Sequence, residues 1–444
     1  MPRIYIETYG CQMNVSDSEL ILGVLGRNGY APTDDLSIAD VILVNTCAVR
    51  DHAEQKVLSR LGELKRFKRP KGVLGVVGCM AQRLGPRLLE RVPQVDLVVG
   101  PDGYRGLPGL IARVRAGGAG GGERAADVEF RRWEHYEDVP PVRETPISAF
   151  VTVQRGCDYR CTFCIVPMTR GPERSRMLDD VVREVTDLAH GGTTEVTLLG
   201  QTVNSYDDGA HDFADLLRAV GAVAGLRRLR FTSPYPTDFS ERVVTAMAET
   251  PHVCEHVHLP VQSGSSRVLK RMLRRYDRAR YLEVVAALRC AIPGIALTTD
   301  IIVGFPGETE ADFQETLSLV EAVAFDDAYT FKYSPREGTP ATRLKDAVPD
   351  DVAGERLERL VAAVRAVARR KNVALVGSTH EVLVEGRAKR GDFLQGRTRT
   401  NKVALIAGPD AWIGQYRDVR LTGTTGSTFT AVPLGRGQEL AVVG

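Results

Sequence analysis

The chain has 444 residues, more than a single hydrophobic core usually serves, so two or three domains are expected. Hydrophobic residues make up 43% and charged residues 26%, which is ordinary for a globular protein, so we do not expect a disordered chain. The formal net charge of +2 is close to zero, so only local clusters of charge can indicate a nucleic-acid surface. The sequence contains no apolar run of about 18 residues and no apolar leader, and we therefore expect a cytoplasmic protein without a membrane segment.

The first part of the chain alternates short apolar runs with segments of helical period, which predicts a parallel α/β domain over residues 1–115. Three of the predicted strands run directly into a cysteine, and these are Cys11, Cys47 and Cys79. Parallel strands end on one edge of their sheet, where ligands collect. Each cysteine alone is best explained as a small buried residue. Three at equivalent positions instead indicate a three-thiolate iron–sulfur site.

A second group of cysteines, Cys157, Cys161 and Cys164, has the spacing C-x3-C-x2-C, and no further cysteine follows until Cys254. Structural zinc sites and ferredoxin clusters take four protein ligands, so a trio predicts a metal centre with one open position. A zinc knuckle is the alternative. It is disfavoured because the nearest later candidate, His190, lies too far away for finger spacing.

The other two cysteines, Cys254 and Cys290, belong to neither trio. Disulfides are not expected in a reducing compartment, and Cys290 falls in the helix-like run 281–291. We therefore predict that both are packing residues rather than metal ligands.

Beyond the first domain, a glycine-rich stretch and a polar segment predict a linker over 116–144. Six strand candidates alternate with helices over 145–375, which indicates a partial (β/α)6 barrel with its site at the carboxyl ends of the strands. Residues 376–444 contain short strand-like runs separated by turns, which predicts a small β-barrel of about five strands.

Cations gather in two places. Residues 270–280 carry six, and the last predicted domain carries Arg387, Lys389, Arg390, Arg397, Arg399 and Lys402. Such clusters predict phosphate contacts, and a basic β-barrel suits single-stranded or looped RNA. The alternative is a solvated charged face on a stabilising appendage.

The cysteine motif at 157–164, with Phe163 in the aromatic position before its last cysteine, resembles the radical S-adenosylmethionine (SAM) enzymes. The resemblance implies a 4Fe-4S cluster with one iron open to the amino and carboxylate groups of SAM. A later run with Gly304, Pro306 and Gly307 closely resembles the glycine-containing segment that contacts the SAM adenine in those enzymes. A plain tight turn is the alternative for that run.

Further SAM contacts are expected where predicted strands end, and the candidates are Gln201, Asn204, Tyr206, Gln262, Ser263 and Arg274. For the first three, capping of the next helix is the alternative. Arg274 is the position at which a bidentate clamp for the SAM carboxylate is expected.

Taken in order, these features resemble the radical SAM methylthiotransferases, which have an N-terminal cluster domain, a radical SAM domain and a C-terminal TRAM domain. The run Thr-Tyr-Gly-Cys-Gln-Met-Asn around Cys11 is very similar to the tRNA-2-methylthio-N6-dimethylallyladenosine synthase branch. The motifs at 169–171 and 333–341 agree with that branch. Met168 departs from it, because tyrosine is common there, and we expect altered packing rather than altered chemistry.

The resemblance implies methylthiolation of carbon 2 of N6-isopentenyladenosine beside the tRNA anticodon. It implies two 4Fe-4S clusters, with the second trio making the radical and the first holding the donated sulfur. SAM supplies both radical and methyl group, and no catalytic side chain beyond the cluster ligands is expected. The implied partners are the tRNA anticodon loop and a low-potential donor such as flavodoxin or ferredoxin, with the protein a monomer.

Three alternatives remain at this point. Two are methylthiolation of threonylcarbamoyl-adenosine in tRNA and of an aspartate in a ribosomal protein, and the motif around Cys11 argues against both. The third is a noncatalytic RNA-binding protein that uses its clusters as a redox sensor. Reductive cleavage of SAM separates this third alternative from an enzyme.

Overall fold

The computed structural model describes residues 1–48, 51–117, 123–143 and 145–434. By their contacts the residues form two compact units: unit 1 comprises Met1–Gly191, Val196–Asp212 and Ser334–Thr342, and unit 2 comprises Gly192–Glu195, Phe213–Tyr333 and Arg343–Gly444. The domain limits expected from the sequence stay predictions. Residues 118–122 and 144 of the expected linker and 435–444 of the expected last domain lie outside the described residues.

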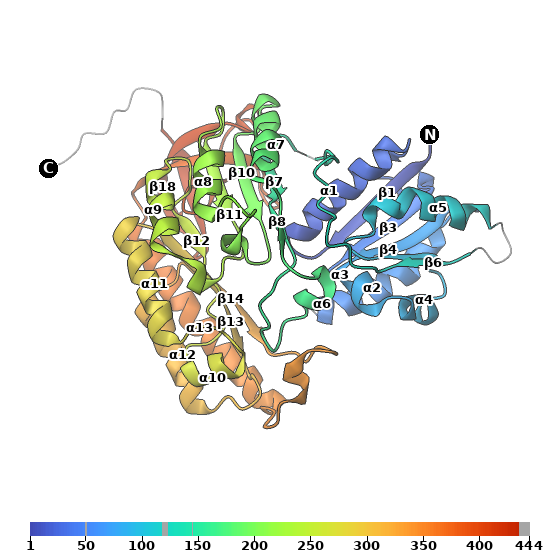
Figure 1. Cartoon of the computed structure of the whole chain (residues 1–444). Coiled ribbons are helices and arrows are strands. Elements are labelled where there is room, and N and C mark those ends of the chain that lie inside the picture. Colours follow the sequence, from blue (N-terminus) through green and yellow to red (C-terminus); the bar gives the residue numbers. More distant parts are fainter. Residues whose placement is uncertain (49–50, 118–122, 144, 435–444) are drawn as a thin grey trace. The chain divides into compact units, whose positions relative to one another are not determined.

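Unit 1 contains a six-stranded parallel sheet in the order β2-β1-β3-β4-β5-β6 (Figure 1). Its strands are β1 (Arg3–Tyr9), β2 (Ala31–Pro32), β3 (Val41–Thr46), β4 (Val73–Gly78), β5 (Leu97–Val99) and β6 (Ala125–Asp127). The helices of this region are α1 (Gln12–Arg27), α2 (Asp51–Leu64), α3 (Cys79–Leu84), α4 (Arg87–Arg91) and α5 (Leu107–Ala116). The predicted parallel α/β fold is confirmed.

Successive residues of β3 point to opposite faces of this sheet, and all of them are buried. Val41 and Leu43 pack in one apolar cluster with residues of α1 and α5. Ile42 and Val44 pack in a second cluster with residues of α2, α3 and α4. Helices on both faces explain why the sequence of β3 is a continuous apolar run rather than an alternating one.

The segment expected to be a linker contributes structure to this sheet. Strand β6 pairs in parallel with β5, and the side chains of Glu134 and Tyr136 are buried. The Tyr136 hydroxyl donates to the Pro101 carbonyl at 2.9 Å. The glycine and polar residues of the segment 116–144 are typical of a linker. Long-range strand pairing and burial are tertiary properties that composition does not reveal.

The rest of unit 1 carries the second cysteine trio. Its elements are β7 (Ser148–Thr152), β8 (Gln154–Arg155), α6 (Val166–Arg170), β9 (Arg174–Ser175) and α7 (Leu178–His190), together with all but the first residue of β10 (Glu195–Leu199). β8 and β9 pair antiparallel, so the chain leaves β8, passes through the cysteines and α6, and returns beside its starting point.

Unit 2 contains β11 (Arg228–Phe231) and a parallel sheet in the order β12-β13-β14, formed by β12 (His256–His258), β13 (Ala296–Val303) and β14 (Asp327–Lys332). Its helices are α8 (Phe213–Gly221), α9 (Glu241–Glu249), α10 (Ser266–Arg271), α11 (Arg278–Ala291), α12 (Glu310–Val323) and α13 (Asp350–Ala374). All six strands expected between 145 and 375 form. No helix in the described part of the chain is long and apolar enough to cross a membrane.

The C-terminal part of unit 2 is a closed barrel in the order β15-β16-β17-β19-β18. Its strands are β15 (Thr379–Arg387), β16 (Leu394–Thr398), β17 (Val403–Ile406), β18 (Tyr416–Thr424) and β19 (Thr428–Pro433). Side chains from all five strands fill its interior, including Val382, Ile406 and Phe429. The predicted five-stranded β-barrel is confirmed, and closure leaves no unpaired strand edge.

Two arginines of β11 fasten this barrel within unit 2. Arg228 is fully buried, and its guanidinium donates to the carbonyls of Arg397 at 2.8 Å and Glu381 at 2.9 Å. Arg230 donates to the carbonyls of Thr398 and Arg399, each at 2.9 Å. A guanidinium presents several donors in a rigid fork, so each arginine satisfies two backbone acceptors at once.

We expect Arg228→Met to weaken this attachment by about 3–5 kcal/mol, because it leaves buried carbonyls and carboxylates without their donor. The measurement is protease sensitivity between α13 and β15, together with the midpoint of urea unfolding. Arg387→Met is the matched control. Arg387 is exposed and pairs with Asp410 on the barrel surface, so its loss should change the unfolding midpoint little. Equal effects of both variants would contradict this account.

Candidate cluster and SAM sites

The first cysteine trio lies at one edge of the parallel sheet of unit 1. Tyr9 of β1 is level with Thr46 of β3, and Thr46 is level with Gly78 of β4. Cys11 follows Tyr9 by two positions, whereas Cys47 and Cys79 each follow directly after their strand. The Cys47 backbone N–H donates to the Tyr9 carbonyl at 2.9 Å, which extends the pairing to the cysteine itself.

Two buried asparagines hold the turn that carries Cys11. The Asn14 side-chain oxygen accepts from the Cys11 backbone N–H at 3.3 Å. The Asn14 amide donates to the Asn45 side-chain oxygen at 3.1 Å, and Asn45 donates back to the Asn14 carbonyl at 2.8 Å. Cys47 and Cys79 are buried and Cys11 is exposed, so the trio is open on the Cys11 side.

Cys79 has a charged neighbour that the sequence did not indicate. The Arg170 guanidinium donates from Nε to the Cys79 sulfur at 3.1 Å, and Arg170 Nη1 is buried without a hydrogen-bond partner among the described residues. Burial raises the pKa of the Cys79 thiol, and the Arg170 charge offsets part of that increase. A buried, unused N–H beside a cysteine suits an anionic iron–sulfur cluster, whose sulfides accept hydrogen bonds.

The second trio lies in the loop between β8 and α6. The Cys164 N–H donates to the Cys161 carbonyl at 3.0 Å, and the Cys157 N–H donates to the Gly171 carbonyl at 3.2 Å. Cys157 and Cys161 are buried, and Cys164 is partly exposed. Burial raises the pKa of the Cys157 thiol to about 11, and a bound metal would favour its thiolate form.

Among residues in the described ranges, no three His, Cys, Asp or Glu side chains are grouped so that they could hold one metal ion. The ligand role of both trios therefore stays a prediction. Outside the trios, Cys254 is buried and Cys290 is exposed.

A carboxylate beside the second trio was missed from the sequence. Glu173 accepts hydrogen bonds from the Thr202 hydroxyl at 3.1 Å and the Ser205 hydroxyl at 2.9 Å, and Thr202 also hydrogen-bonds with Cys157. Burial raises the pKa of Glu173. The only signal in the sequence was its place nine residues after Cys164, and it needed the fold to bring Thr202 and Ser205 to it.

The candidates after β10 differ from one another. Tyr206 is buried and donates to the Arg176 carbonyl at 2.7 Å, which is a packing role in this structure. Asn204 is buried, and Phe163 is partly exposed in the cysteine loop. Gln201 is different, because its side-chain oxygen is buried without a hydrogen-bond partner among the described residues. Gln201 is therefore the candidate whose side-chain oxygen is available to accept a hydrogen bond.

Met168, the departure from the family motif, is 47% exposed at α6. Its terminal methyl group lies against Gly338, where an added Cβ would be only 2.7 Å away. Residues 334–342 belong to unit 1, and this part of the motif at 333–341 packs against α6 through Met168.

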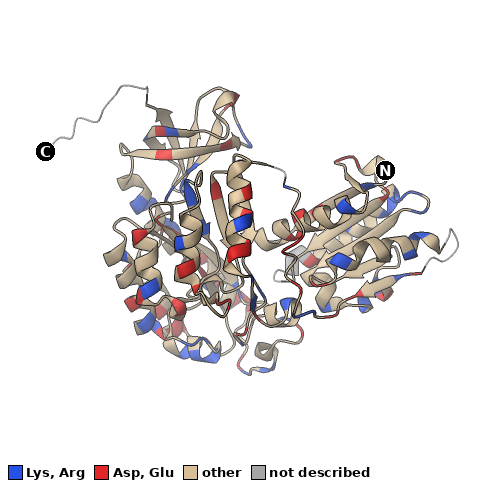
Figure 2. Ribbon diagram, turned by 45° about the horizontal axis from the view of Figure 1, so that its top comes forward, with Lys and Arg blue, Asp and Glu red and all other residues tan. Residues whose placement is uncertain are grey.

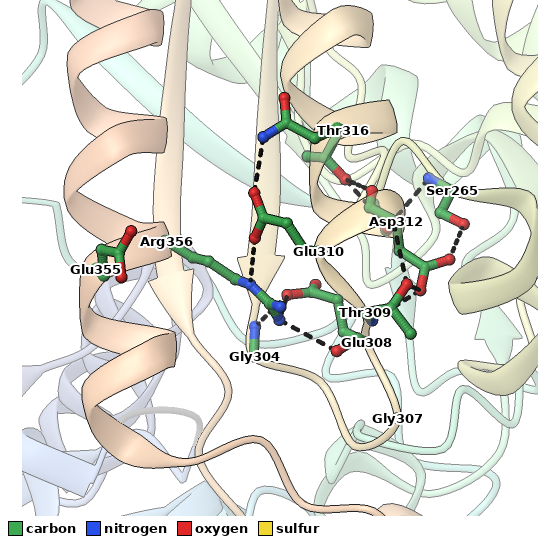
Figure 3. Close-up of polar contacts among 12 residues, drawn as sticks. Ser265, Gly304, Gly307, Glu308, Thr309, Glu310, Asp312, Thr316, Glu355 and Arg356 are labelled. Atoms are coloured by element: carbon green, nitrogen blue, oxygen red, sulfur yellow. Dashed lines mark hydrogen bonds and ion pairs between the residues drawn. The ribbon is translucent and has the colours of Figure 1, made fainter.

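In unit 2 the glycine-containing run follows β13 and is braced by buried charges (Figure 3). The Gly304 N–H donates to a Glu308 carboxylate oxygen, which also accepts from Arg356 of α13, both at 2.9 Å. Burial raises the pKa of Glu308. Gly304 and Gly307 have φ of +71° and +81°, a conformation that favours glycine.

The start of α12 is held in the same region. Asp312 accepts from Thr309 in a capping box and from the Ser265 hydroxyl at 2.7 Å (Figure 3). Ser263 accepts from the Ser265 N–H at 3.2 Å, so it supports the turn that opens α10. Gln262 has φ of +72° and exchanges backbone hydrogen bonds with the residues around Ile301.

Several arginines of the basic run 270–280 are engaged within unit 2. Arg274 donates to the Tyr276 hydroxyl at 2.8 Å and stacks on the Tyr235 ring at 4.2 Å. Arg271 donates to the Pro306 carbonyl at 3.0 Å, and Arg278 donates to the Gly264 carbonyl at 3.3 Å. In this structure these guanidinium groups brace loops, and a role for them in binding phosphate or SAM stays a prediction.

Some cations of the barrel form ion pairs, whereas others are exposed. Arg397 pairs with Glu385 at 3.0 Å, Arg399 with Glu255 at 2.8 Å, and Lys402 with Asp326 at 2.9 Å. Lys389 and Arg390 are exposed, and neither forms an ion pair with another residue in the described ranges. Figure 2 shows the same mixture more widely, with Lys and Arg interleaved with Asp and Glu along the helices.

Comparison with known families matches three consecutive segments. Residues 3–100 match the Uncharacterized protein family UPF0004, residues 151–320 the Radical SAM superfamily, and residues 373–432 the TRAM domain. A tRNA-2-methylthio-N6-dimethylallyladenosine synthase of Chloroherpeton thalassium is 46% identical over 433 residues, covering 96% of this chain and 95% of that protein. A protein of the same name from Geobacter metallireducens is 48% identical, covering 94% and 95%.

Solved structures with the same fold are more distant in sequence. The radical S-adenosylmethionine methyltransferase TsrM from Kitasatospora setae gives a TM-score of 0.60 at 15% identity, covering 83% of this chain and 89% of TsrM. The cobalamin-dependent S-adenosylmethionine radical enzyme OxsB gives 0.53 at 14% identity, covering 83% and 58%. At these identities the likeness concerns the fold alone.

We expect Gly304→Ala to destabilise unit 2 more than Gly294→Ala does. Both glycines have positive φ, +71° and +77°, so both variants should lose about 1–2 kcal/mol to backbone strain. A Cβ at Gly304 would lie 2.6 Å from the Ala353 Cβ, whereas nothing lies within 4 Å at Gly294. Overpacking should add about 1–3 kcal/mol for Gly304→Ala alone. Thermal unfolding of both variants is the measurement, and equal losses would contradict the crowding argument.

Proposed function

The chain belongs to the tRNA-2-methylthio-N6-dimethylallyladenosine synthase family of radical SAM enzymes, and we propose that it adds a methylthio group to carbon 2 of N6-isopentenyladenosine in tRNA. The superfamily uses a 4Fe-4S cluster and SAM, and the TRAM domain agrees with a tRNA substrate. The observation that carries the proposal is the presence in unit 1 of two separate cysteine trios, one at a sheet edge and one in the loop after β8.

The bond to be replaced is an unactivated aromatic C–H bond, which no side-chain acid or base can open. The cluster and SAM supply, when bound, the radical chemistry that attacks such a bond. The protein's part is to hold both groups and to exclude competing reactions. Cys157, Cys161 and Cys164 would hold the cluster, and the Thr202 side chain lies beside the Cys157 sulfur.

Two side chains of unit 1 suit the amino-acid end of SAM. The Glu173 carboxylate, already oriented by Thr202 and Ser205, would pair with the ammonium group, and the buried Gln201 oxygen would accept a hydrogen bond from it. The run with Gly304, Pro306 and Gly307 stays our candidate for adenine contact in unit 2, and Gln262 and Ser263 stay candidates for SAM contact. Arg274 is retained as a weaker candidate, because its guanidinium is already engaged by Tyr276.

We propose that Cys11, Cys47 and Cys79 hold a second 4Fe-4S cluster that provides the transferred sulfur. Their common sheet edge, the open side at Cys11 and the Arg170 donor beside Cys79 support this role. A low-potential flavodoxin or ferredoxin would supply electrons, and we expect a monomer that works in the cytoplasm. The relatives' common name and the motif around Cys11 favour isopentenyladenosine over threonylcarbamoyl-adenosine or a ribosomal aspartate.

The two trios should separate on mutation. Replacing Cys11, Cys47 and Cys79 together by alanine should halve the iron content and abolish methylthiolated adenosine, yet leave reductive cleavage of SAM to 5'-deoxyadenosine. Replacing Cys157, Cys161 and Cys164 should also halve the iron but abolish cleavage. Iron analysis and mass spectrometry of 5'-deoxyadenosine and tRNA nucleosides are the measurements.

Cys290→Ser is the control for these replacements, because Cys290 is exposed and lies on α11 away from either trio in sequence. It should keep full iron and full activity. Methylthiolated product from the first triple variant would refute the sulfur-donor role. If the wild-type protein does not cleave SAM reductively, that result would instead favour the redox-sensing alternative.

Capture of tRNA should depend on the two exposed cations of the β15–β16 turn. The double variant Lys389→Ala, Arg390→Ala should weaken binding of an isopentenylated anticodon stem-loop and lower the slope of log affinity against log salt by about 1–2. SAM cleavage without tRNA should not change. Arg387→Ala, whose side chain is paired with Asp410, is the control and should alter the slope much less. Fluorescence anisotropy at several salt concentrations measures this, and an unchanged slope in the double variant would exclude the turn from tRNA binding.

A further inference from the structure

A buried polar network in unit 1 connects the two cysteine motifs. At its centre is Asp17 of α1, which is 0% exposed. Its carboxylate forms ion pairs with Arg170 at 2.6 Å and Arg155 at 3.3 Å, and accepts a hydrogen bond from the Tyr104 hydroxyl at 3.3 Å. Arg155 and Arg170 are 4% and 3% exposed, so none of these charges is screened by water.

The charges of this network do not cancel. Asp17 is the one carboxylate in the described ranges that forms an ion pair with either Arg155 or Arg170, so two guanidinium groups face a single negative charge. A buried charge without a partner costs several kcal/mol. The remaining positive charge is directed at Cys79, whose sulfur accepts from Arg170 Nε at 3.1 Å. Arg170 Nη1, buried and unused, is a further donor on the same group.

The network also has a particular place in the chain. Arg155 ends β8 two residues before Cys157, and Arg170 ends α6 six residues after Cys164. The arginines therefore flank the second trio, while the sulfur that receives the hydrogen bond belongs to the first. Ala48, Cys79 and Ile165 pack together beside them, which places the residues next to Cys47 and Cys164 in one apolar contact.

We propose that Arg170 is a positioning residue that holds Cys79 and raises the reduction potential of the cluster on Cys11, Cys47 and Cys79. Asp17 lowers the same potential. An N–H donor to a ligand sulfur and a nearby positive charge both stabilise the reduced, more negative state of a cluster. Asp17 opposes this by its negative charge. The inference rests on the proposed function, because that function assigns a cluster to the first trio.

The arrangement explains why the arginine comes from the other motif. Arg170 reaches Cys79 from the end of α6, so the charge around the first cluster depends on the packing of α6 within unit 1. The proposal thereby links the reduction potential of the first cluster to the position of α6.

The test uses the full chain with Cys157, Cys161 and Cys164 replaced by alanine, so that only the first cluster contributes to the spectra. After reconstitution with iron and sulfide, redox titration with dithionite followed by electron paramagnetic resonance gives the midpoint potential. Arg170→Gln in this background should shift the potential to more negative values and speed loss of iron to a chelator. Asp17→Asn should shift it to more positive values.

Two further variants keep the test decisive. Arg170→Lys retains the charge without the planar Nε donor, so its negative shift should be smaller than that of Arg170→Gln. It serves as the test variant if Arg170→Gln does not fold. Arg176→Gln is the matched control, because Arg176 is also buried and pairs with Glu184 at 2.6 Å but has no described contact with a cysteine. Its potential should equal that of the parent.

Shifts of the same sign for Arg170→Gln and Asp17→Asn, or unchanged potentials with iron retained, would overturn the proposal. An equal shift in Arg176→Gln would also overturn it, because the effect would then reflect general disturbance of the unit. If the parent with only the first trio binds no iron, the proposed second cluster fails and this inference fails with it. That result differs from one in which the cluster forms and its midpoint potential does not depend on Arg170.

Discussion

Parallel pairing of β1, β3 and β4 is the constraint on which unit 1 depends, because it brings Cys11, Cys47 and Cys79 to one sheet edge. Side chains separated by more than 30 residues in the chain meet there without any local motif. The buried Asn14–Asn45 pair then fixes the turn at Cys11, and hydrophobic layers on both faces hold the strands in register. The positions of the three cysteines at the edge therefore depend on the hydrophobic core of this sheet.

Several arginines hold backbone segments of unit 2 in place through hydrogen bonds to carbonyl and carboxylate groups. Arg228 and Arg230 fasten the C-terminal barrel by its backbone carbonyls, Arg271 and Arg278 hold loops, and Arg356 holds the glycine run through Glu308. These contacts explain how a chain with 58 basic residues presents few uncommitted cations in its basic segments. In the barrel, Lys389 and Arg390 of the β15–β16 turn are exposed, and they stay our candidates for contact with tRNA.

The two cysteine trios are organised by opposite means. The second is a contiguous loop that contains a backbone hydrogen bond between Cys161 and Cys164. The first is assembled from three strands and completed by Arg170, a residue of the other motif. A contiguous loop suits a cluster that must accept a mobile cofactor, and an assembled edge suits one whose environment depends on the state of the whole unit.

The sequence alone determined the fold class, the six strands of the central region, the five-stranded barrel and the grouping of the cysteines, because periodicity and motif spacing are local properties. It also pointed to Gly304 and Gly307, through their resemblance to the glycine-containing segment of radical SAM enzymes. Only the tertiary structure revealed β6 in the expected linker, the packing role of Tyr206, and the engagement of Arg274 with Tyr276. The same holds for Glu173 and for the Asp17–Arg170–Cys79 network, because the partners of a buried polar group are chosen by long-range packing that no local pattern encodes.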